Sequence, residues 1–294
     1  DVTSEKKTGA QLFGIGNQCP NASTSPCSFV PGASAGSGVL YFPLPIDYTN
    51  TQVNARLNYA GSKLQLSGGY YGSFLTNNFG ALNPGIPPIL NNATGQPLPA
   101  GPGVQGYLGQ PVASSPDNSF NYFDLTGAYA FMPELKSNFK FAYSRATQKQ
   151  EFTSAGLTGA PAGVGNLGAE VTSTLAQIRV IGNPIPKLSI VGEYRYQNTE
   201  DNTPLVAYNV TPTVISTNNP VSREVNSAKL EATYRFPYSI QGTAGVGWNS
   251  IDRSYLTTVS YNGISALRQT TDETSWWLEV RRSMTETLSG SLRY

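Results

Sequence analysis

The side chains of this chain that could do chemistry are few, and its two cysteines come first among them. Cys19 and Cys27 lie in a segment rich in Pro, Ser and Asn. Their spacing is not that of a CxxC pair, and the chain contains no histidine that could complete a metal site with them. Because disulfides form in oxidising compartments, we predict a loop disulfide between these two residues.

The lack of histidine narrows the possible chemistry further. Histidine is the usual general base, the commonest metal ligand and the usual proximal haem ligand, and the sequence has none. There is also no CxxCH motif for covalent haem attachment, and a Ser–His arrangement for nucleophilic catalysis is excluded for this segment. We therefore predict no catalytic residue, no metal ligand and no cofactor bound by this chain itself.

One acidic cluster could in principle bind a metal ion. Glu200, Asp201 and Asn202 are adjacent in the sequence, and carboxylate and amide oxygens are ligands that Ca²⁺ accepts. Asp and Asn are equally the residues that turns and solvated loops select. Of the two interpretations we favour the solvated loop.

The composition is unlike that of an ordinary soluble core. Charged residues make up 13% of the chain and hydrophobic residues 39%, whereas soluble domains carry about 25% charged residues. A barrel wall that is apolar on one face and polar on the other averages to such values. The balance of 19 basic and 18 acidic residues gives no support for a nucleic-acid partner.

The elements that must position the side chains have a period of two. From Thr51 to Tyr59, Val53 and Leu57 belong to one face, and Gln52 and Arg56 belong to the other. A Gly-containing turn follows and a second alternating segment returns, which is typical of a β-hairpin. The same unit recurs four more times, so we predict ten strands, as hairpins over residues 51–73, 119–148, 169–198, 223–251 and 273–294.

Short and long connections alternate along the chain. Within each hairpin the turn has a few residues, whereas residues 74–117, 149–168, 199–222 and 252–272 form long polar connections. Short turns at one end and long loops at the other are typical of bacterial outer-membrane barrels, and soluble sandwiches and propellers rarely show this regularity. We therefore predict an all-β, antiparallel up-and-down transmembrane β-barrel in the outer membrane, with residues 1–50 as an extracellular loop region.

The two faces of the predicted strands differ in their side chains. Aromatic residues that can form the girdles of a barrel at the membrane interfaces lie on the apolar face near strand ends: Tyr70, Tyr129, Phe131, Tyr143, Tyr194, Tyr196, Tyr234, Phe236 and Tyr294. Charged residues on the opposite face are hard to bury in a small core. We predict that they face the lumen and a partner inside it: Arg56, Lys140, Arg179, Glu193, Arg195, Lys229, Glu231 and Arg235.

Several short motifs resemble one family of outer-membrane proteins when they are taken in order. They are Glu5-Lys6-Lys7-Thr8-Gly9, Pro45-Ile46-Asp47-Tyr48-Thr49, Gly69-Tyr70-Tyr71-Gly72-Ser73-Phe74, Pro116-Asp117-Asn118, Tyr143-Ser144-Arg145-Ala146-Thr147-Gln148, Pro184-Ile185-Pro186-Lys187-Leu188, Tyr194-Arg195-Tyr196 and Asp201-Asn202-Thr203-Pro204. Each motif alone is weakly specific. Together they resemble the MtrB/PioB family, the decahaem-associated barrels of porin–cytochrome electron conduits.

The resemblance implies a function that the residues alone do not. A family barrel sheathes a periplasmic multihaem c-type cytochrome in its lumen, so that electrons cross the outer membrane, and an extracellular multihaem cytochrome docks on the long loops. By this resemblance the haem belongs to the partner, and the chain contacts membrane lipid. Family members are about twice as long and often carry an N-terminal CxxC pair. We therefore expect a fragment of a larger barrel, although residues 288–294 also have the alternation of a genuine C-terminal strand.

Two other functions are compatible with the same pattern. One is a solute diffusion porin with a water-filled lumen, and the other is a surface adhesin or receptor that acts through its loops. The lumen charges are of mixed sign, which favours neither anion nor cation passage. Haem that accompanies the purified barrel would distinguish the conduit from both alternatives.

Overall fold

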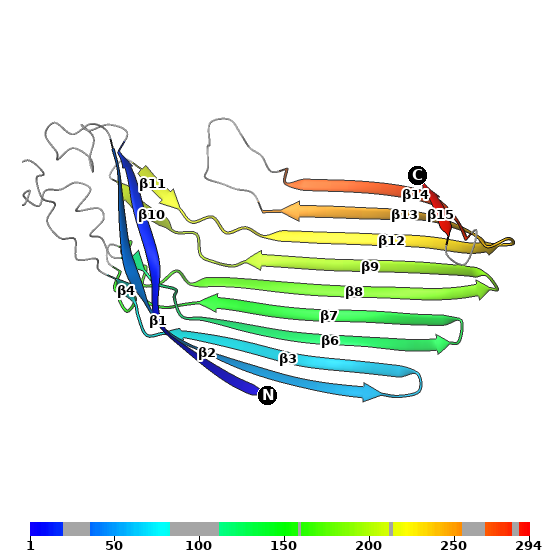
Figure 1. Cartoon of the computed structure of the whole chain (residues 1–294), viewed down its shortest axis with the longest axis horizontal. Coiled ribbons are helices and arrows are strands. Elements are labelled where there is room, and N and C mark those ends of the chain that lie inside the picture. The colour runs from blue at the N-terminus through cyan, green and yellow to red at the C-terminus, as the bar shows by residue number, and fades with distance from the viewer. Residues whose placement is uncertain (20–35, 83–111, 158–159, 212–213, 255–267, 284–287) are drawn as a thin grey trace, which may run out of the picture.

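The computed structural model describes residues 1–19, 36–82, 112–157, 160–211, 214–254, 268–283 and 288–294. Most of them form one antiparallel sheet of eleven strands, in the order β1-β2-β3-β6-β7-β8-β9-β12-β13-β14-β15. Each of these strands lies beside the one before it in the chain, as Figure 1 shows. Their bounds are β1 Val2–Cys19, β2 Gly36–Ala60, β3 Leu64–Asn77, β6 Asn118–Met132, β7 Leu135–Gln148, β8 Ala169–Ile185, β9 Leu188–Asp201, β12 Arg223–Phe236, β13 Ile240–Arg253, β14 Thr270–Ser283 and β15 Ser289–Arg293.

The short turns all lie at one end of this sheet and the long connections at the other (Figure 1). The predicted hairpins correspond to the pairs β2–β3, β6–β7, β8–β9, β12–β13 and β14–β15. At the loop end, β4 (Ala81–Leu82) pairs with β5 (Val112–Ala113), and β10 (Ala207–Thr211) pairs with β11 (Val214–Thr217). The sheet is open, with β1 and β15 as its two edges. No helix among the described residues is long and apolar enough to cross a membrane.

The first fifty residues differ from the prediction, because they form strands where we expected a loop region. β1 pairs with β2 along its whole length, from Val2 opposite Val53 to Cys19 opposite Gly36. The outer part of this pair leaves the sheet at the loop end as a two-stranded ribbon (Figure 1), in which the rings of Phe13 and Phe42 lie 5.6 Å apart. Pro43 and Pro45 lie within β2 itself, although proline is rare inside strands.

The sheet is a single layer with almost no core. Among the described residues, the buried ones are Gly72, Ser137 and Ala142, and the last two are each 5% exposed. The accessible surface of the chain is 19733 Å², whereas a globular monomer of this mass exposes about 12,000 Å². The apolar surface that this layer presents has to be covered by something other than the chain's own core.

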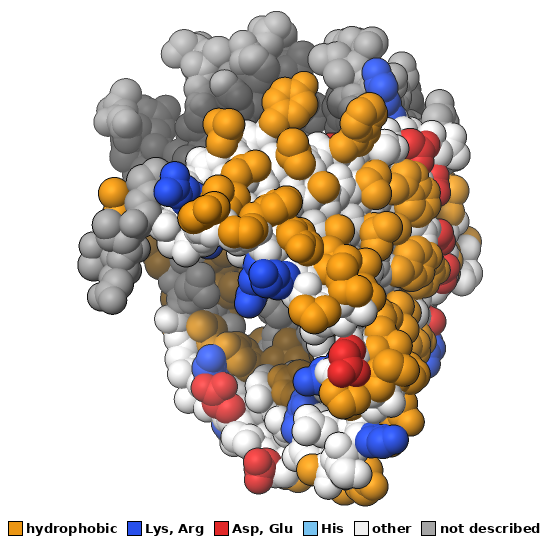
Figure 2. Space-filling view, turned by 90° about the vertical axis from the view of Figure 1, so that its right-hand side faces the viewer, with side chains coloured by type: hydrophobic (Ala, Val, Ile, Leu, Met, Phe, Trp, Pro, Cys, Tyr) orange, Lys and Arg blue, Asp and Glu red, His pale blue; other side chains and the backbone are white. Residues whose placement is uncertain are grey.

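The register places the apolar side chains on one face. Directly opposed residues of neighbouring strands point to the same face, and one row of opposed residues runs through Leu66, Gly127, Phe139, Ile178 and Tyr194. Hydrophobic side chains form a continuous band when the molecule is seen from the turn end (Figure 2). We call this band the apolar belt, and its exposed members include Leu57, Tyr59, Phe123, Leu125, Phe141, Tyr143, Ile178, Tyr194, Leu230, Val246, Trp248, Trp276, Leu278 and Val280.

Aromatic pairs lie towards both ends of the apolar belt. At the loop end the rings of Tyr70 and Phe123 are 4.8 Å apart, and the Tyr70 hydroxyl donates to Asn121 Oδ1 at 2.9 Å. At the turn end Tyr234 packs edge-on against Phe236 with ring centroids 4.8 Å apart. Rings with an apolar body and a polar tip suit the two boundaries between hydrocarbon and water.

Replacement of Gly127 by Val tests the packing of the apolar belt. A Cβ atom on Gly127 would meet the ring of Phe139 and would lie 2.8 Å from Leu66 Cδ2. Because both side chains would have to move, we expect Gly127→Val to lower the free energy of unfolding by about 1–2 kcal/mol. The matched control is Gly192→Val on the same face, where a Cβ atom would meet only Leu230 Cδ1, at 4.0 Å. Urea unfolding in lipid vesicles measures both variants, and equal losses would contradict this account.

Candidate functional site

The face opposite the apolar belt carries all eight charged residues that the sequence singled out. We call it the polar face. One row of opposed residues joins Arg179, Glu193 and Lys229, and the next row joins Lys140, Gln177 and Arg195. Arg56 reaches the same face opposite Gly69, whose other neighbour is Asp124. Glu231 and Arg235 follow Lys229 at even spacing along β12.

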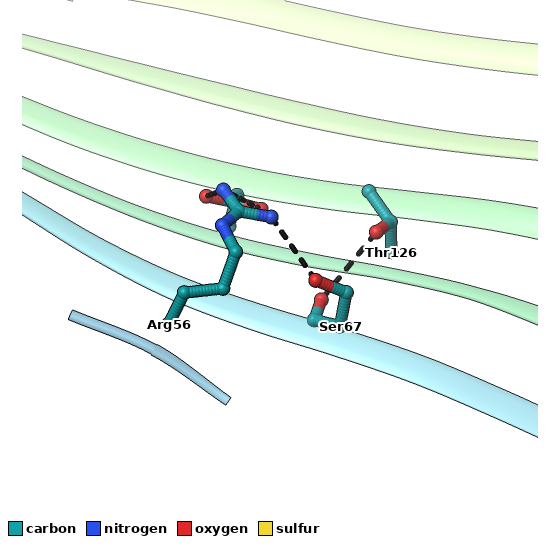
Figure 3. Close-up of polar contacts among 4 residues, drawn as sticks. Arg56, Ser67 and Thr126 are labelled. Carbon is teal, nitrogen blue, oxygen red and sulfur yellow. Dashed lines mark hydrogen bonds and ion pairs between the residues drawn. The ribbon is translucent and has the colours of Figure 1, made fainter. Parts of the chain in front are cut away.

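Arg56 forms the centre of a polar network on β2, β3 and β6. Its Nη2 atom lies 3.2 Å from Asp124 Oδ1, and its Nη1 atom donates to Ser67 Oγ at 3.0 Å. The Thr126 hydroxyl donates to the Ser67 carbonyl at 3.4 Å, and Figure 3 shows these contacts. The Asp124 side chain is only 8% exposed, whereas that of Arg56 is 51% exposed. The carboxylate therefore depends on this cation for much of its compensation.

Gly69 makes the bridge between Arg56 and Asp124 possible. The two charged residues are on β2 and β6, with β3 between them. A Cβ atom on Gly69 would lie 2.6 Å from Asp124 Oδ1 and 3.0 Å from Arg56 Nη2. The ion pair therefore lies directly over the bare backbone of β3.

A second cluster lies on β12, β13 and β14. Lys229 Nζ lies 2.9 Å from Glu231 Oε2 and 5.1 Å from the centre of the Trp277 ring. The ring itself lies over Gly245, where a Cβ atom would collide with it. A cation over an indole face is a favourable arrangement, so Lys229 and Glu231 are held within the wall by their own neighbours.

The other charged residues that we predicted to face the lumen make fewer side-chain contacts within the wall. Glu193 Oε1 accepts a hydrogen bond from Gln177 Nε2 at 3.0 Å, and Arg195 Nη2 donates to Gln197 Oε1 at 2.8 Å. Within the described part of the chain, Lys140, Arg179 and Arg235 form no side-chain hydrogen bond or ion pair, and all three are exposed. These cations are free to meet another molecule.

The register also shows that the two signs of charge are unequal on the polar face. Basic side chains are the majority: Lys7, Arg56, Lys136, Lys140, Arg179, Arg195, Arg223, Lys229, Arg235, Arg253, Arg281 and Arg293. The acidic ones are Glu5, Asp124, Glu193, Asp201, Glu231, Glu273 and Glu279. Charges of both signs are present as expected, but the face is basic on balance.

Sequence reasoning missed the aromatic residues of the polar face as functional candidates. Tyr71 and Phe120 have ring centroids 6.3 Å apart, and Phe120 is stacked with Tyr122 at 6.4 Å. Trp277 lies on the same face, next to a Trp276 that points to the apolar belt. The sequence could have revealed them, because each of these aromatic residues is separated by an even number of positions from the polar residues of its own strand and so shares their face.

The acidic cluster of the sequence has a structural task. Asp201 Oδ1 accepts from the Thr203 amide at 3.1 Å and Asp201 Oδ2 from the Val221 amide at 3.3 Å, while Asn198 Nδ2 donates to Glu200 Oε1 at 2.7 Å. Asp201 thus ties down both ends of the connection between β9 and β12. The part of the chain that the structure describes has no group of three metal-ligating side chains.

The predicted disulfide falls outside what the structure describes. Cys27 belongs to residues 20–35, and for Cys19 only the backbone is described. The pairing of Cys19 with Cys27 stays a prediction.

Lys7, which lies level with the loop end of β3, has a shifted pKa. Lys7 Nζ lies 3.5 Å from Glu5 Oε1 and 5.8 Å from the centre of the Tyr48 ring. The negative charge of Glu5, and then Tyr48, raise the pKa of the Lys7 ammonium above its ordinary value. The ion pair with Glu5 therefore favours the charged form of Lys7.

Solved structures that match this chain include an iron receptor and an iron transporter. The ferric enterobactin receptor of Pseudomonas aeruginosa (a G324V mutant) matches 85% of this chain and 36% of its own, with a TM-score of 0.44 and 14% identity. The FrpB iron transporter of Neisseria meningitidis matches 85% of this chain and 37% of its own, with a TM-score of 0.45 and 9% identity. With TM-scores this low, the fold assignment rests on the sheet itself and on the family.

Comparison of sequences gives a more specific result. Outer membrane protein MtrB of Shewanella baltica (strain OS185) is 23% identical over 248 residues, which are 83% of this chain and 32% of that protein. The chain thus spans about a third of the length of this relative. The family model of outer membrane beta-barrel porins, MtrB/PioB, matches residues 1–294. The apolar belt is therefore the lipid-facing surface of an outer-membrane protein, and the chain belongs to the MtrB/PioB family of outer-membrane β-barrel porins.

Proposed function

We propose that this chain forms part of the wall of a barrel that encloses a periplasmic multihaem c-type cytochrome. The apolar belt faces lipid, and the polar face borders the lumen and contacts the cytochrome. The haems carry electrons across the outer membrane, while the wall keeps lipid away from them. A second multihaem cytochrome at the cell surface meets the long loops. The family resemblance implies this arrangement, and three features of the chain support it.

The observation that carries the proposal is the composition of the polar face. Protein interfaces are enriched in Tyr, Trp, Phe and Arg and depleted in Lys. The basic residues of the polar face are mainly Arg, and Tyr71, Phe120, Tyr122 and Trp277 lie among them. In a water-filled pore these aromatic rings would be exposed to solvent. The polar face is therefore better suited to a folded protein than to a diffusing solute.

The lack of histidine in this chain supports a partner protein that carries and ligates the haem itself. Histidine is the usual proximal ligand of haem iron, and the chain has none. A haem beside this part of the wall is then expected to take its histidine ligands from the partner. The protein wall contributes hydrogen bonds, ion pairs and exclusion of lipid.

The hollow at the turn end fits the place where a periplasmic partner enters. It has a volume of about 980 Å³ and lies between the β8–β9 turn and β12–β13. Polar-face residues Thr233, Arg235 and Gln241 line it together with Lys187 of the turn. Short turns are the periplasmic end of outer-membrane barrels, so the periplasmic mouth is lined with hydrogen-bonding groups and with charged groups of both signs, since Glu134 also lines the hollow.

Purification from the native membrane tests the proposal. The protein that carries this chain is tagged, extracted in mild detergent and separated by size-exclusion chromatography. We expect haem absorbance to elute with the barrel, and a haem stain of the same fractions to show a covalently attached c-type cytochrome. An unrelated outer-membrane barrel, purified from the same membrane in the same way, is the colourless control.

The other functions predict different results in the same experiment. A colourless barrel that conducts ions in a planar bilayer would overturn the sheath and establish a diffusion porin. A colourless barrel without conductance that still binds host or cell surfaces through its loops would establish an adhesin or receptor.

A further inference from the structure

Three cations on neighbouring strands form a basic patch in the middle of the polar face. Lys140 is on β7, Arg179 on β8 and Arg195 on β9. Lys140 and Arg195 lie on either side of Gln177 in one row, and Arg179 follows Gln177 two residues along the same strand. All three are exposed. We keep the name basic patch for these three residues.

The acidic residues near the basic patch do not neutralise it. Glu193 lies directly opposite both Arg179 and Lys229, and its Oε1 atom is hydrogen-bonded to Gln177. Asp124, on the other side, is paired with Arg56. Glu231 is paired with Lys229. Two of the three nearby carboxylates are therefore paired with cations outside the basic patch. The third, Glu193, cannot balance three positive charges, so the basic patch keeps a net positive charge.

A small recess adjoins the basic patch. Its volume is about 130 Å³, and its polar-face lining includes Arg195, Ala142, Leu175, Ser144 and Ser173. Ala142 is one of the three buried residues of the described chain. The recess thus has an apolar floor, hydroxyl groups on its sides and a guanidinium at its rim. It is large enough for one short side chain of a partner.

The width of the basic patch indicates the kind of partner. Neighbouring strands lie about 4.8 Å apart, so the three cations extend over two strand spacings, roughly 10 Å. A single small anion above a one-layer wall would meet one or two of them and keep most of its water. A protein surface that bears several carboxylates can meet all three at once, with its neutral groups against Asn138, Gln177 and Gln197, which border the basic patch.

We propose that the basic patch is a docking surface for an acidic region of a protein enclosed by the barrel, and that a partner side chain occupies the recess beside Arg195. This inference rests on the proposed function and deepens it, because it assigns the contact to Lys140, Arg179 and Arg195 and gives the partner region its charge. Charge complementarity of this kind fixes the register and orientation of a partner. The basic patch therefore holds the enclosed protein in one rotational setting.

Removal of the three charges tests the docking surface. The K140Q/R179Q/R195Q variant of the full protein is purified from its native membrane at low and at high salt, and haem absorbance is measured per barrel. We expect at least a tenfold loss of haem relative to the wild type at high salt, because loss of two or three partly desolvated charge contacts costs on the order of a tenfold change in affinity or more. The charge-reversed K140E/R179E/R195E variant loses haem at low salt as well.

Two control variants separate docking from folding and from net charge. The K140R/R179K/R195K variant keeps the three charges and is expected to retain haem. The K6Q/K63Q/K149Q variant also loses three charges, but from an outer strand, a turn and a loop, and it is expected to match the wild type. Resistance of each barrel to heat in gel electrophoresis confirms folding.

The possible failures of the two proposals differ. A haem-bearing wild type whose K140Q/R179Q/R195Q variant keeps the same haem would overturn the docking surface and leave the proposed function intact. A haem-free wild type overturns the proposed function and the docking surface with it. If that haem-free barrel is anion-selective in a bilayer and the variant is not, the basic patch acts on small diffusing anions.

Discussion

Leu230→Arg is expected to lower the free energy of unfolding by about 2–4 kcal/mol, the cost of a cation at the lipid-facing midplane of a barrel. Leu230 is 53% exposed and lies between Gly192 and Val246 in the apolar belt. On its own strand Tyr234 lies towards the turn end and Asn226 towards the loops. The new guanidinium therefore has no short route to water. Urea titration in lipid vesicles, followed by tryptophan fluorescence, measures the change.

The matched control for Leu230→Arg is Ser227→Arg on the same strand. Ser227 belongs to the polar face, opposite Arg195 and Asn249. An arginine there reaches water or polar groups, so we expect a change within about 1 kcal/mol. A larger loss at Ser227 than at Leu230 would show that the assignment of the two faces is reversed.

Arg56→Ala is expected to destabilise the barrel by about 1–2 kcal/mol. The Asp124 carboxylate, 8% exposed, would lose the cation that lies 3.2 Å from it. An unpaired buried charge costs 3–5 kcal/mol, and we reduce this value because Arg56 is half exposed and water can reach part of the site. The measurement is the same vesicle unfolding experiment.

Two further variants identify the bridge itself as the cause of the loss. In an Asp124→Ala background, Arg56→Ala should cost clearly less, and the difference is the coupling energy of the pair. Gly69→Val leaves both charges in place but puts a side chain where the bridge passes. We expect it to give a loss similar to that of Arg56→Ala. Equal effects of Arg56→Ala in both backgrounds would assign the loss to packing of the arginine stem.

The outcome of these stability tests is independent of the haem experiments. Leu230 acts through lipid, and the Arg56–Asp124 bridge acts within the wall. The basic patch has few contacts within the wall, since Lys140 and Arg179 form none by their side chains among the described residues and Arg195 bonds only to Gln197. Substitution of the basic patch should therefore affect the partner and change the stability of the barrel little.

The sequence by itself determined the hairpins, their two faces and the membrane environment. These properties are local, because a strand alternates its side chains with a period of two whatever its partner is. The predicted hairpin over residues 119–148 corresponds to β6 and β7, and Arg56, Lys140 and Glu231 all lie on the polar face. The small fraction of charged residues, together with strands whose apolar and polar side chains alternate, then indicated a barrel wall between lipid and a polar interior.

The first fifty residues show where prediction from the local sequence pattern failed. Pro43 and Pro45 are rare inside strands because proline cannot donate to the ladder. In the structure they lie in the part of β2 that has β1 as its one described neighbour, so the missing donors are tolerated at an open edge. Only the pairing with β1 makes this segment a strand. Pro43 and Pro45 lie opposite Leu12 and Ala10, which are 31 and 35 residues away, and local periodicity does not show partners at that distance.

The tertiary structure alone decided which polar residues meet. Arg56 and Asp124 are 68 residues apart, and they meet because the register places both opposite Gly69. Lys140, Arg179 and Arg195 come from three strands, and their grouping depends on how those strands are aligned. Register is set by turn lengths and by the packing of whole faces. A shift of two residues would keep every apolar side chain in the belt, yet it would separate the bridge and disperse the basic patch.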